Sequence, residues 1–121
     1  ELTIGCAGGT DVTATGTYNE QLTSHQSAFR ITIKGLTGGH SGVDIHKGRA
    51  NANKLMNRIL LELSNLFTIQ IASIDGGSLR NAIPRESQAL FTIAPEHSEE
   101  VVKKIQGFNA IVKNEYHFTI I

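Results

Sequence analysis

Two short segments of the sequence carry residues that can polarise a carbonyl group or hold a carboxylate. His40 sits in the run Gly-Gly-His-Ser-Gly at residues 38–42. An imidazole N–H aimed at a carbonyl oxygen stabilises the negative charge that develops there during hydrolysis. Further along, Arg80 and Asn81 precede Pro84 and offer a guanidinium and an amide that can bind a carboxylate or a polarised carbonyl. Both segments are candidate functional sites.

Glycines determine how the first segment can behave. Four of the eight residues at 35–42 are glycine, which permits tight or left-handed turns around His40. The loop can therefore present the imidazole rigidly. The plainer alternative is a loop histidine that bonds to its own backbone. For the second segment the plainer alternative is capping of a turn by Asn81. The residues expected to support the histidine loop are Gly38, Gly39, Ser41 and Gly42.

Other kinds of chemistry find little support in the residues. His40, Asp44 and His46 are metal-type donors, but their loop lacks the i, i+4 helical spacing of a His pair, so no metal site is expected in this chain. No serine pairs with an identifiable His and Asp, and the single cysteine, Cys6, lies in an apolar stretch. A nucleophilic site is therefore not predicted, and Gly8-Gly9 lacks the lysine of a phosphate loop.

Composition narrows the class of protein. The 121 residues are enough for one domain, and 40% of them are apolar. The 11 basic and 11 acidic side chains cancel without a basic stripe, which argues against nucleic acid as a partner. No apolar run is long enough for a membrane span. A lone cysteine suits a reducing cytoplasm, where we expect the protein to be located.

Periodicity predicts the elements that position these segments. Apolar residues recur at three- and four-residue steps over residues 49–66, which predicts an amphipathic helix. A second helix is predicted from Ser98, its proposed cap, with Glu99 and Glu100 in the first turn. Its predicted inward side chains are Val101, Val102, Ile105, Phe108 and Val112.

Alternation predicts the strands. The segments 29–33, 67–74, 88–93 and 115–120 each read as a strand, the last with Tyr116, Phe118 and Ile120 on one face. The order β-α-β-β-α-β predicts an α+β, ferredoxin-like fold with a four-stranded antiparallel sheet and two helices on one face. Residues 2–6 and 12–18 additionally predict an N-terminal strand pair.

Two long motifs carry a family resemblance. Residues 38–55, GGHSGVDIHKGRANANKL, and residues 76–86, GGSLRNAIPRE, closely resemble the aminoacyl-histidine dipeptidases, also called Xaa-His or cytosol non-specific dipeptidases. These belong to the M20 zinc metallopeptidases, in which a lid and dimerisation domain is inserted into a separate catalytic domain. The resemblance covers essentially the whole chain. It implies that residues 1–121 are one such lid domain from a longer peptidase, inactive alone.

The resemblance also implies roles for individual residues. His40 matches the lid histidine that reaches across the dimer to stabilise the oxyanion at the partner's site, and Asn81 matches a substrate-contacting asparagine. Many relatives end the next strand with Asp-x-Arg, whose arginine binds the substrate carboxylate. Here the strand runs into Ala94-Pro95, so Arg80 is the substitute candidate. The implied cofactor is two zinc ions held by the catalytic domain, none by this chain, and the implied partners are a dipeptide substrate and a second copy.

Two other functions remain open on the sequence. The ferredoxin-like fold hosts many activities, so the chain could be a stand-alone module that binds or senses a small ligand at the loop of residues 38–42. It could also be a structural interaction domain in which His40 and Asn81 affect only stability.

Overall fold

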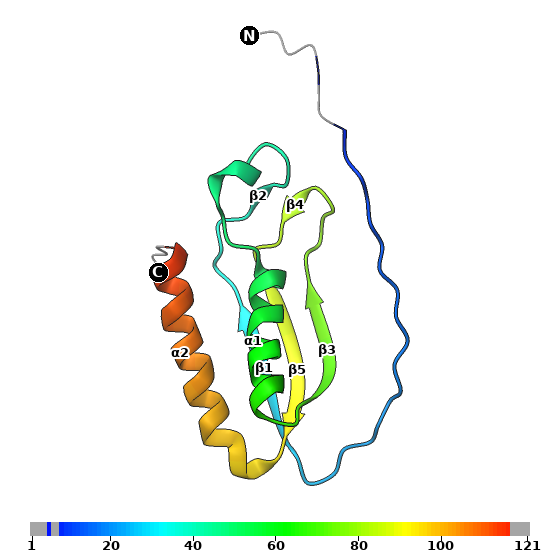
Figure 1. Cartoon of the computed structure of the whole chain (residues 1–121), viewed down its shortest axis with the longest axis vertical. Helices are drawn as coiled ribbons and strands as arrows, with labels where there is room; N and C mark the ends of the chain where they lie inside the picture. Colours follow the sequence, from blue (N-terminus) through cyan, green and yellow to red (C-terminus); the bar gives the residue numbers. More distant parts are fainter. Residues whose placement is uncertain (1–4, 6–7, 117–121) are drawn as a thin grey trace.

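The chain forms an α+β domain in a computed structural model, which describes Gly5 and residues 8–116. Two helices pack on the same face of a three-stranded antiparallel sheet, and a small two-stranded sheet stands at one end of these two layers (Figure 1). The α+β class and the two helices on one sheet face agree with the prediction.

The main sheet has the strand order β1-β5-β3. β1 spans Ser27–Ile33, β3 spans Gln70–Gly76 and β5 spans Ser87–Ile93. Because β5 pairs antiparallel with both neighbours, β1 and β3 run parallel to each other and are connected through a helix. This is a split β-α-β unit, as predicted for these three strands. β3 has a register irregularity between Ile71 and Ser73.

Alternation along the central strand builds the core. Every second residue of β5, starting at Ser87, is buried against the helices. Phe91 is fully buried and stacks on Phe29 of β1, with ring centroids 5.8 Å apart. Burying side chains of this size contributes about 1.5–3 kcal/mol each before entropy is counted. The sheet is therefore held to the helices mainly by its middle strand.

Helix α1, Ala52–Leu66, carries the apolar stripe predicted for residues 49–66. It begins three residues later than predicted, because Asn51 is extended and its side chain accepts bonds from the N–H groups of Asn53 and Lys54 at 3.0 and 3.2 Å. Such a cap satisfies donors that the first turn leaves unpaired. The buried residues of the helix are Ala52, Leu55, Met56, Ile59, Leu60 and Leu63.

Helix α2, Ser98–Tyr116, packs on α1 through its buried residues Val101, Phe108 and Val112. Ser98 already has helical dihedral angles and follows the 3-10 turn Pro95–His97, so the prediction that it caps the helix is wrong. Val102 was predicted to point inward but is 43% exposed, since it lies 100° around the helix from Val101. No helix among residues 8–116 is both long and apolar enough to cross a membrane.

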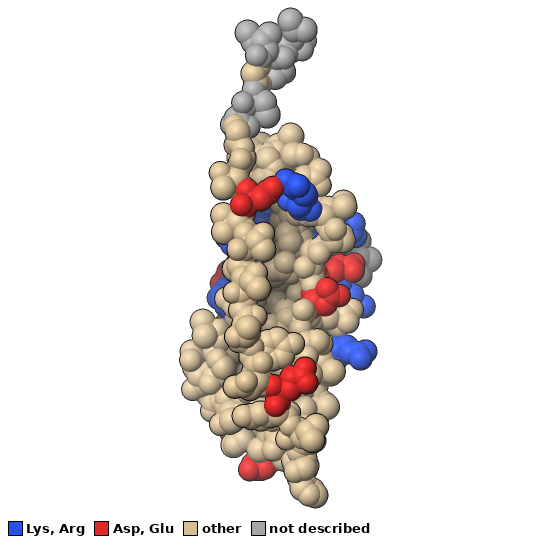
Figure 2. All heavy atoms as spheres, turned by 90° about the vertical axis from the view of Figure 1, so that its right-hand side faces the viewer, with Lys and Arg blue, Asp and Glu red and all other residues tan. Residues whose placement is uncertain are grey.

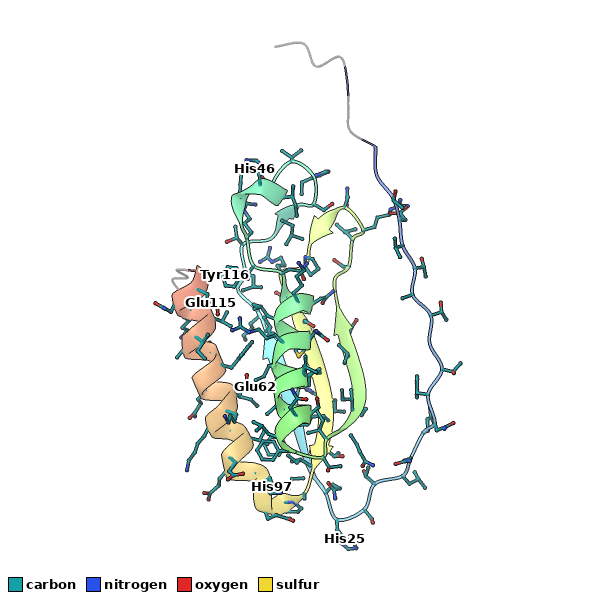
Figure 3. All side chains as sticks on the ribbon, in the orientation of Figure 1. His25, His46, Glu62, His97, Glu115 and Tyr116 are labelled. Carbon is teal, nitrogen blue, oxygen red and sulfur yellow. The ribbon has the colours of Figure 1, made fainter. Side chains whose placement is uncertain are left out.

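An ion pair ties the two helices near the carboxyl end of α2. Arg58 of α1 donates two hydrogen bonds to the Glu115 carboxylate, at 2.7 and 2.9 Å, and lies 5.4 Å from the centre of the Phe108 ring. Glu115 lies on the side of α2 that faces α1 (Figure 3). The hydrogen bonds from Arg58 lower the pKa of Glu115 below its ordinary value. The pair is part-exposed, so its contribution to the stability of the fold is small.

Three strand predictions need correction. The strand predicted at residues 67–74 begins at Gln70, because Phe67 ends α1 and packs against the His97 ring with centroids 5.1 Å apart. Of the closing strand predicted at 115–120, Glu115 and Tyr116 are helical, and residues 117–121 lie outside the described residues.

Of the predicted N-terminal strand pair, the part that the structure describes, residues 12–18, is not a strand. Residues 8–24 form an extended arm with no strand, although 12–18 alternate as a strand would. In Figure 1 the arm runs beside the domain on the β3 side. Two side-chain contacts of the arm are seen, Gln21 with Gln70 and Asp11 with Arg80. Leu2 to Cys6 fall, apart from Gly5, outside the described residues.

A matched pair of neighbouring valines tests the packing of α2. Val101 is 0% exposed and Val102 is 43% exposed. Replacing either by alanine changes helix propensity equally, so their difference isolates the core contact. We expect Val101→Ala to lower the free energy of unfolding by about 2 kcal/mol more than Val102→Ala. Urea denaturation measures both, and equal values would contradict the packing described.

Candidate functional site

The structure brings the two candidate segments together. Strand β2, Gly39–His40, pairs antiparallel with strand β4, Ala82–Ile83, so that His40 lies opposite Ala82. The Ser41 N–H extends the pairing by donating to the Asn81 carbonyl at 2.9 Å. Two loops about forty residues apart in sequence thus form one ribbon at the end of the domain. Neither short strand was predicted, because two residues carry no alternation to detect.

The His40 side chain is fixed by its own loop. Its Nδ1 accepts hydrogen bonds from the N–H groups of Gly42 and Val43 at 3.0 and 3.1 Å. A nitrogen that accepts two N–H groups carries no proton, so the neutral ring has its proton on Nε2. Nε2 has no partner among the described residues, and the side chain is exposed. The ring thus bonds to its own backbone through Nδ1, as the plainer alternative predicts, and this leaves Nε2 available to another molecule.

Asp44 holds the backbone of this loop. Its Oδ2 accepts the N–H of His40 at 2.8 Å, and its Oδ1 lies 2.7 Å from Lys47 Nζ. The hydrogen bonds from Lys47 and His40 lower the pKa of Asp44 from 3.8 to about 2. Because the folded pKa lies below the ordinary value, the ionised carboxylate stabilises the loop above pH 3.8. That contribution is lost as the pH falls through about 2.

Arg49 connects Asp44 to the glycines. Its Nη1 donates to the Gly38 carbonyl at 2.7 Å and lies 3.4 Å from Asp44 Oδ2. Gly39 has a φ of +140°, and a Cβ there would lie 2.2 Å from Arg49 Nη1 and 2.7 Å from Asp44 Oδ2. A side chain at this position would occupy the space of the ion pair. The predicted supporting role of Gly39 thus has a specific cause.

The other residues predicted to support the loop, Gly38, Gly42 and Ser41, do not touch the Asp44–Arg49 pair in the way that Gly39 does. Gly38 has a φ of +67°, and its Cβ position lies 3.3 Å from Arg85 Cβ. At Gly42 a Cβ would press on the His40 ring at 3.3 Å. Ser41 contributes its backbone N–H to the pairing with Asn81, and no hydrogen bond of its hydroxyl is seen.

Arg80 and Asn81 occupy the turn before β4, and both are exposed. The Arg80 side chain, 81% exposed, pairs with Asp11 of the N-terminal arm. Such an exposed pair is worth about 0–1 kcal/mol and leaves the guanidinium able to exchange partners. Asn81 is joined to the histidine loop through its backbone carbonyl. Their roles toward a substrate remain predictions.

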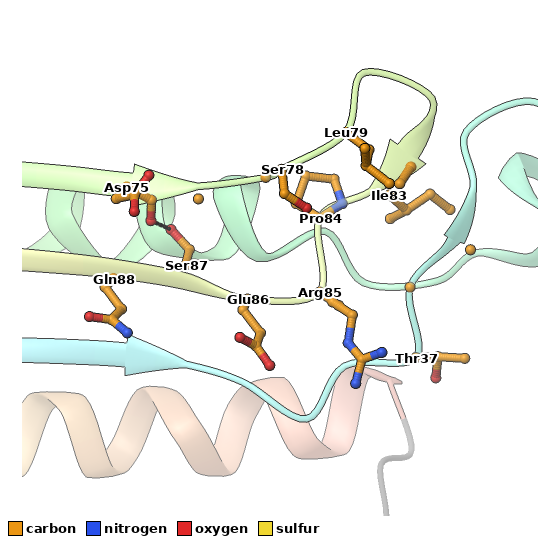
Figure 4. Close-up of a pocket in the computed structure, with 15 residues that line it drawn as sticks. Thr37, Asp75, Ser78, Leu79, Ile83, Pro84, Arg85, Glu86, Ser87 and Gln88 are labelled. Atoms are coloured by element: carbon orange, nitrogen blue, oxygen red, sulfur yellow. Dashed lines mark hydrogen bonds between the residues drawn. The ribbon is translucent and has the colours of Figure 1, made fainter.

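A cleft of about 480 Å³ opens beside this ribbon (Figure 4). Residues 37–39, 75–79 and 82–88 line it, and Leu79 and Ile83 lie together near one end. Neither His40 nor Asn81 is among the lining residues. Both candidate residues are exposed and lie outside this cleft, so the cleft does not enclose a substrate between them.

The donor groups do not fit a metal ion. No group of three or more His, Cys, Asp or Glu in the described part of the chain could hold one. Asp44 is already paired with Lys47 and Arg49, and Nδ1 of His40 already accepts two N–H groups. His46 lies in the 3-10 turn Ile45–Lys47 on the outside of the loop (Figure 3). Asp44 and His40 thus use their acceptor atoms within the loop.

The sequence pattern did not identify Asp44 and Arg49 as supports of the histidine. In the sequence, Asp44 has the features of a metal-type donor, and Arg49 stands at the start of the predicted helix. The pairing joins Arg49 to Gly38, eleven positions earlier. Such a bond follows no helical or strand period, so periodicity offers no signal for it.

Comparison with known proteins agrees with the resemblance seen in the sequence. A family model described as peptidase dimerisation domain matches residues 31–119. The chain is 39% identical over 116 residues to the cytosol non-specific dipeptidase of Escherichia coli K12, covering 95% of this chain and 24% of that protein. The chain therefore spans about a quarter of the length of this curated relative.

Solved structures show the same fold. The aminoacylhistidine dipeptidase of Vibrio alginolyticus superposes with a TM-score of 0.75 at 36% identity, covering 79% of this chain and 20% of that one. An aminobenzoyl-glutamate utilization protein from Klebsiella pneumoniae superposes with a TM-score of 0.58 at 15% identity, covering 76% and 25% of the two chains. At that identity the second match shows the fold alone.

Substitution of Gly39 tests whether the loop is built around the ion pair. We expect Gly39→Ala to destabilise the protein by about 1–3 kcal/mol, because a methyl group would displace Arg49 and Asp44 at a backbone angle that alanine disfavours. Gly48→Ala is the control, since Gly48 has a φ of +63° but no atom within 4 Å of its Cβ position. Thermal and urea unfolding measure both variants. Equal destabilisation would attribute the effect to backbone angle alone.

Proposed function

The chain belongs to the peptidase dimerisation domain family, and from that premise we propose that it is the lid and dimerisation domain of a longer dipeptidase. The observation that carries this proposal is the ribbon in which the His40 loop and the Asn81 turn lie side by side, with both residues exposed. Such a half-site requires a second surface to complete it. The names of the Escherichia coli and Vibrio alginolyticus relatives support dipeptides, including aminoacyl-histidine, as the substrate class.

In this proposal His40 stabilises the transition state of peptide hydrolysis. Its Nε2–H is a neutral donor, and the two bonds at Nδ1 hold the ring so that the donor needs no reorganisation. A preorganised donor is worth most where negative charge develops on a carbonyl oxygen. Asn81 contacts the substrate, and Arg80 is the candidate for its carboxylate. Two zinc ions in a separate catalytic domain would supply Lewis acidity; no residue described here is assigned to them.

A second copy of the chain is the proposed partner of the α1–β3 surface, defined by Leu61, Ile71 and Ile74. These side chains are 57%, 48% and 56% exposed. β3 is the outer strand of its sheet, and its free edge can pair with an equivalent strand across a twofold axis. Asn53 of α1 bonds to the Gly76 carbonyl at 3.2 Å, which places helix and edge in one surface.

The charge distribution fits the same partner. Figure 2 views the arm and the β3 side and shows mainly uncharged atoms with a few separated charged groups. Two identical surfaces with few charged groups can meet with little repulsion, which a strongly charged face would prevent. The arm in front of this side is fastened by few contacts.

Two finer points complete the proposal. The free edge of β1 borders an apolar groove of about 370 Å³ that Ile31, Ile33 and Phe108 help to line. A chain segment following α2 would complete the predicted four-stranded ferredoxin-like sheet there. The parent protein would act in the cytoplasm, as the name of the Escherichia coli relative suggests. The alternative of a stand-alone ligand-sensing module is less favoured, because the family match covers residues 31–119.

Replacing the histidine in the full-length protein tests the catalytic role. We expect His40→Ala to lower kcat by about 10²–10³-fold with KM little changed, because one oxyanion donor is lost. Dimer mass and metal content, measured by light scattering and elemental analysis, should not change. His46→Ala is the control, since His46 is exposed in the same region and makes no hydrogen bond seen in the structure. Unchanged turnover in His40→Ala would refute the role.

A charge placed on the α1–β3 surface tests dimerisation. We expect Ile74→Lys in the full-length protein to weaken the dimer by roughly 100-fold or more, because a lysine would be buried without a partner. Sedimentation velocity over a concentration series measures the dissociation. Ile111→Lys is the control, since Ile111 is 49% exposed on α2. A dimer that withstands Ile74→Lys but not Ile111→Lys would move the interface to α2.

A further inference from the structure

The orientation of His40 depends on a turn that its own side chain cannot hold alone. The imidazole accepts N–H groups from Gly42 and Val43, so the ring stays in place only while residues 41–44 keep their tight conformation. The Asp44 N–H closes this turn by donating to the His40 carbonyl at 3.0 Å. Whatever fixes the turn therefore also fixes the tautomer and direction of the ring.

The Asp44 side chain also bonds to this turn, through the backbone N–H of His40. While its N–H bonds to the His40 carbonyl, its Oδ2 accepts the His40 N–H at 2.8 Å. The two residues thus exchange hydrogen bonds through both backbone groups of His40. The Asp44 side chain is 17% exposed. No other described side chain bonds to the backbone of His40.

Two cations keep the Asp44 carboxylate in place. Lys47 Nζ lies 2.7 Å from Oδ1, and Arg49 Nη1 lies 3.4 Å from Oδ2. Arg49 also donates to the Gly38 carbonyl, on the far side of the histidine. The space for this contact exists because Gly39 has no side chain. The carboxylate is therefore fixed from both ends of the loop.

We propose that Asp44, held by Arg49, is the positioning residue that keeps His40 in its Nε2–H form with that donor turned outward. The proposal rests on the proposed function of His40 for its catalytic consequence, but the positioning itself is a property of this chain. Without Asp44 the turn at residues 41–44 relaxes, and Nδ1 loses its two N–H donors. The ring then populates both tautomers and several directions.

The tautomer can be measured directly. Long-range proton–nitrogen spectra of the chain labelled with ¹⁵N-histidine distinguish a protonated from an accepting ring nitrogen. In the neutral ring we expect wild-type His40 to show only the Nε2–H tautomer, and Asp44→Ala to show a mixture of the two tautomers. Glu96→Gln is the control, because it removes a carboxylate from the turn at the opposite end of the domain and should leave the His40 signals unchanged.

A second variant separates positioning from loss of folding. Asp44→Asn keeps the shape and one acceptor but weakens the contacts to Lys47 and Arg49, and it should give a smaller shift in the same direction. Backbone amide spectra show whether residues of α1 and β5 stay native in each variant. A pure Nε2–H signature in a natively folded Asp44→Ala protein would overturn the proposal.

Kinetics of the full-length protein provide a second, independent test. We expect Asp44→Ala to lower kcat by about 10- to 100-fold with KM nearly unchanged, since a displaced donor loses most of its effect. Added to His40→Ala it should cost nothing further, because it acts through His40. An additional loss in the double variant would refute action through the histidine. If His40→Ala is neutral, the catalytic role fails, while the tautomer spectra still decide the positioning.

Discussion

The pairing of Gly39–His40 with Ala82–Ile83 is the interaction on which the geometry of the candidate site depends. Polar backbone groups in loops need partners, and these two loops provide them for each other. The segment that follows β4 is also bonded to the main domain, since the Pro84 carbonyl accepts the N–H of Ala52 at 2.9 Å. The start of α1 therefore supports the ribbon directly. A site on two loops gains the rigidity of the helix beneath it.

That support joins the two proposed roles of the chain. Helix α1 bonds to Pro84, next to the ribbon, through Ala52 and to Gly76, at the end of β3, through Asn53. A Cβ at Gly76 would lie 2.2 Å from Asn53 Oδ1, so the strand approaches the helix as closely as glycine allows. If two copies meet through α1 and β3, their contact surface is connected to the His40 ribbon by the hydrogen bond between Ala52 and Pro84. The position of each histidine is then set relative to the partner by rigid elements.

The sequence predicted elements whose residues repeat with a period. Helix α1 and strands β1 and β5 follow from apolar spacing, because each buries one face against the core. The strand expected at residues 12–18 has the right alternation but no neighbour, which shows that alternation alone does not make a strand. Within the site, the glycine loop and the separate Asn81 turn were visible in sequence. Their pairing and the Asp44–Arg49 contact were not, since both depend on tertiary structure.

The placement of β5 between β1 and β3 also has a consequence for how the chain assembles. Pairing β3 with β5 closes only residues 77–86, whereas pairing β1 with β5 closes residues 34–86. The longer closure costs about 1.5 kcal/mol more in chain entropy, which favours the β3–β5 pairing first. The Asn81 turn lies inside the short closure and takes shape with it. Pairing β2 with β4 closes residues 41–81, so the ribbon depends on a contact that is far less local than the β3–β5 pairing and is favoured to form after it.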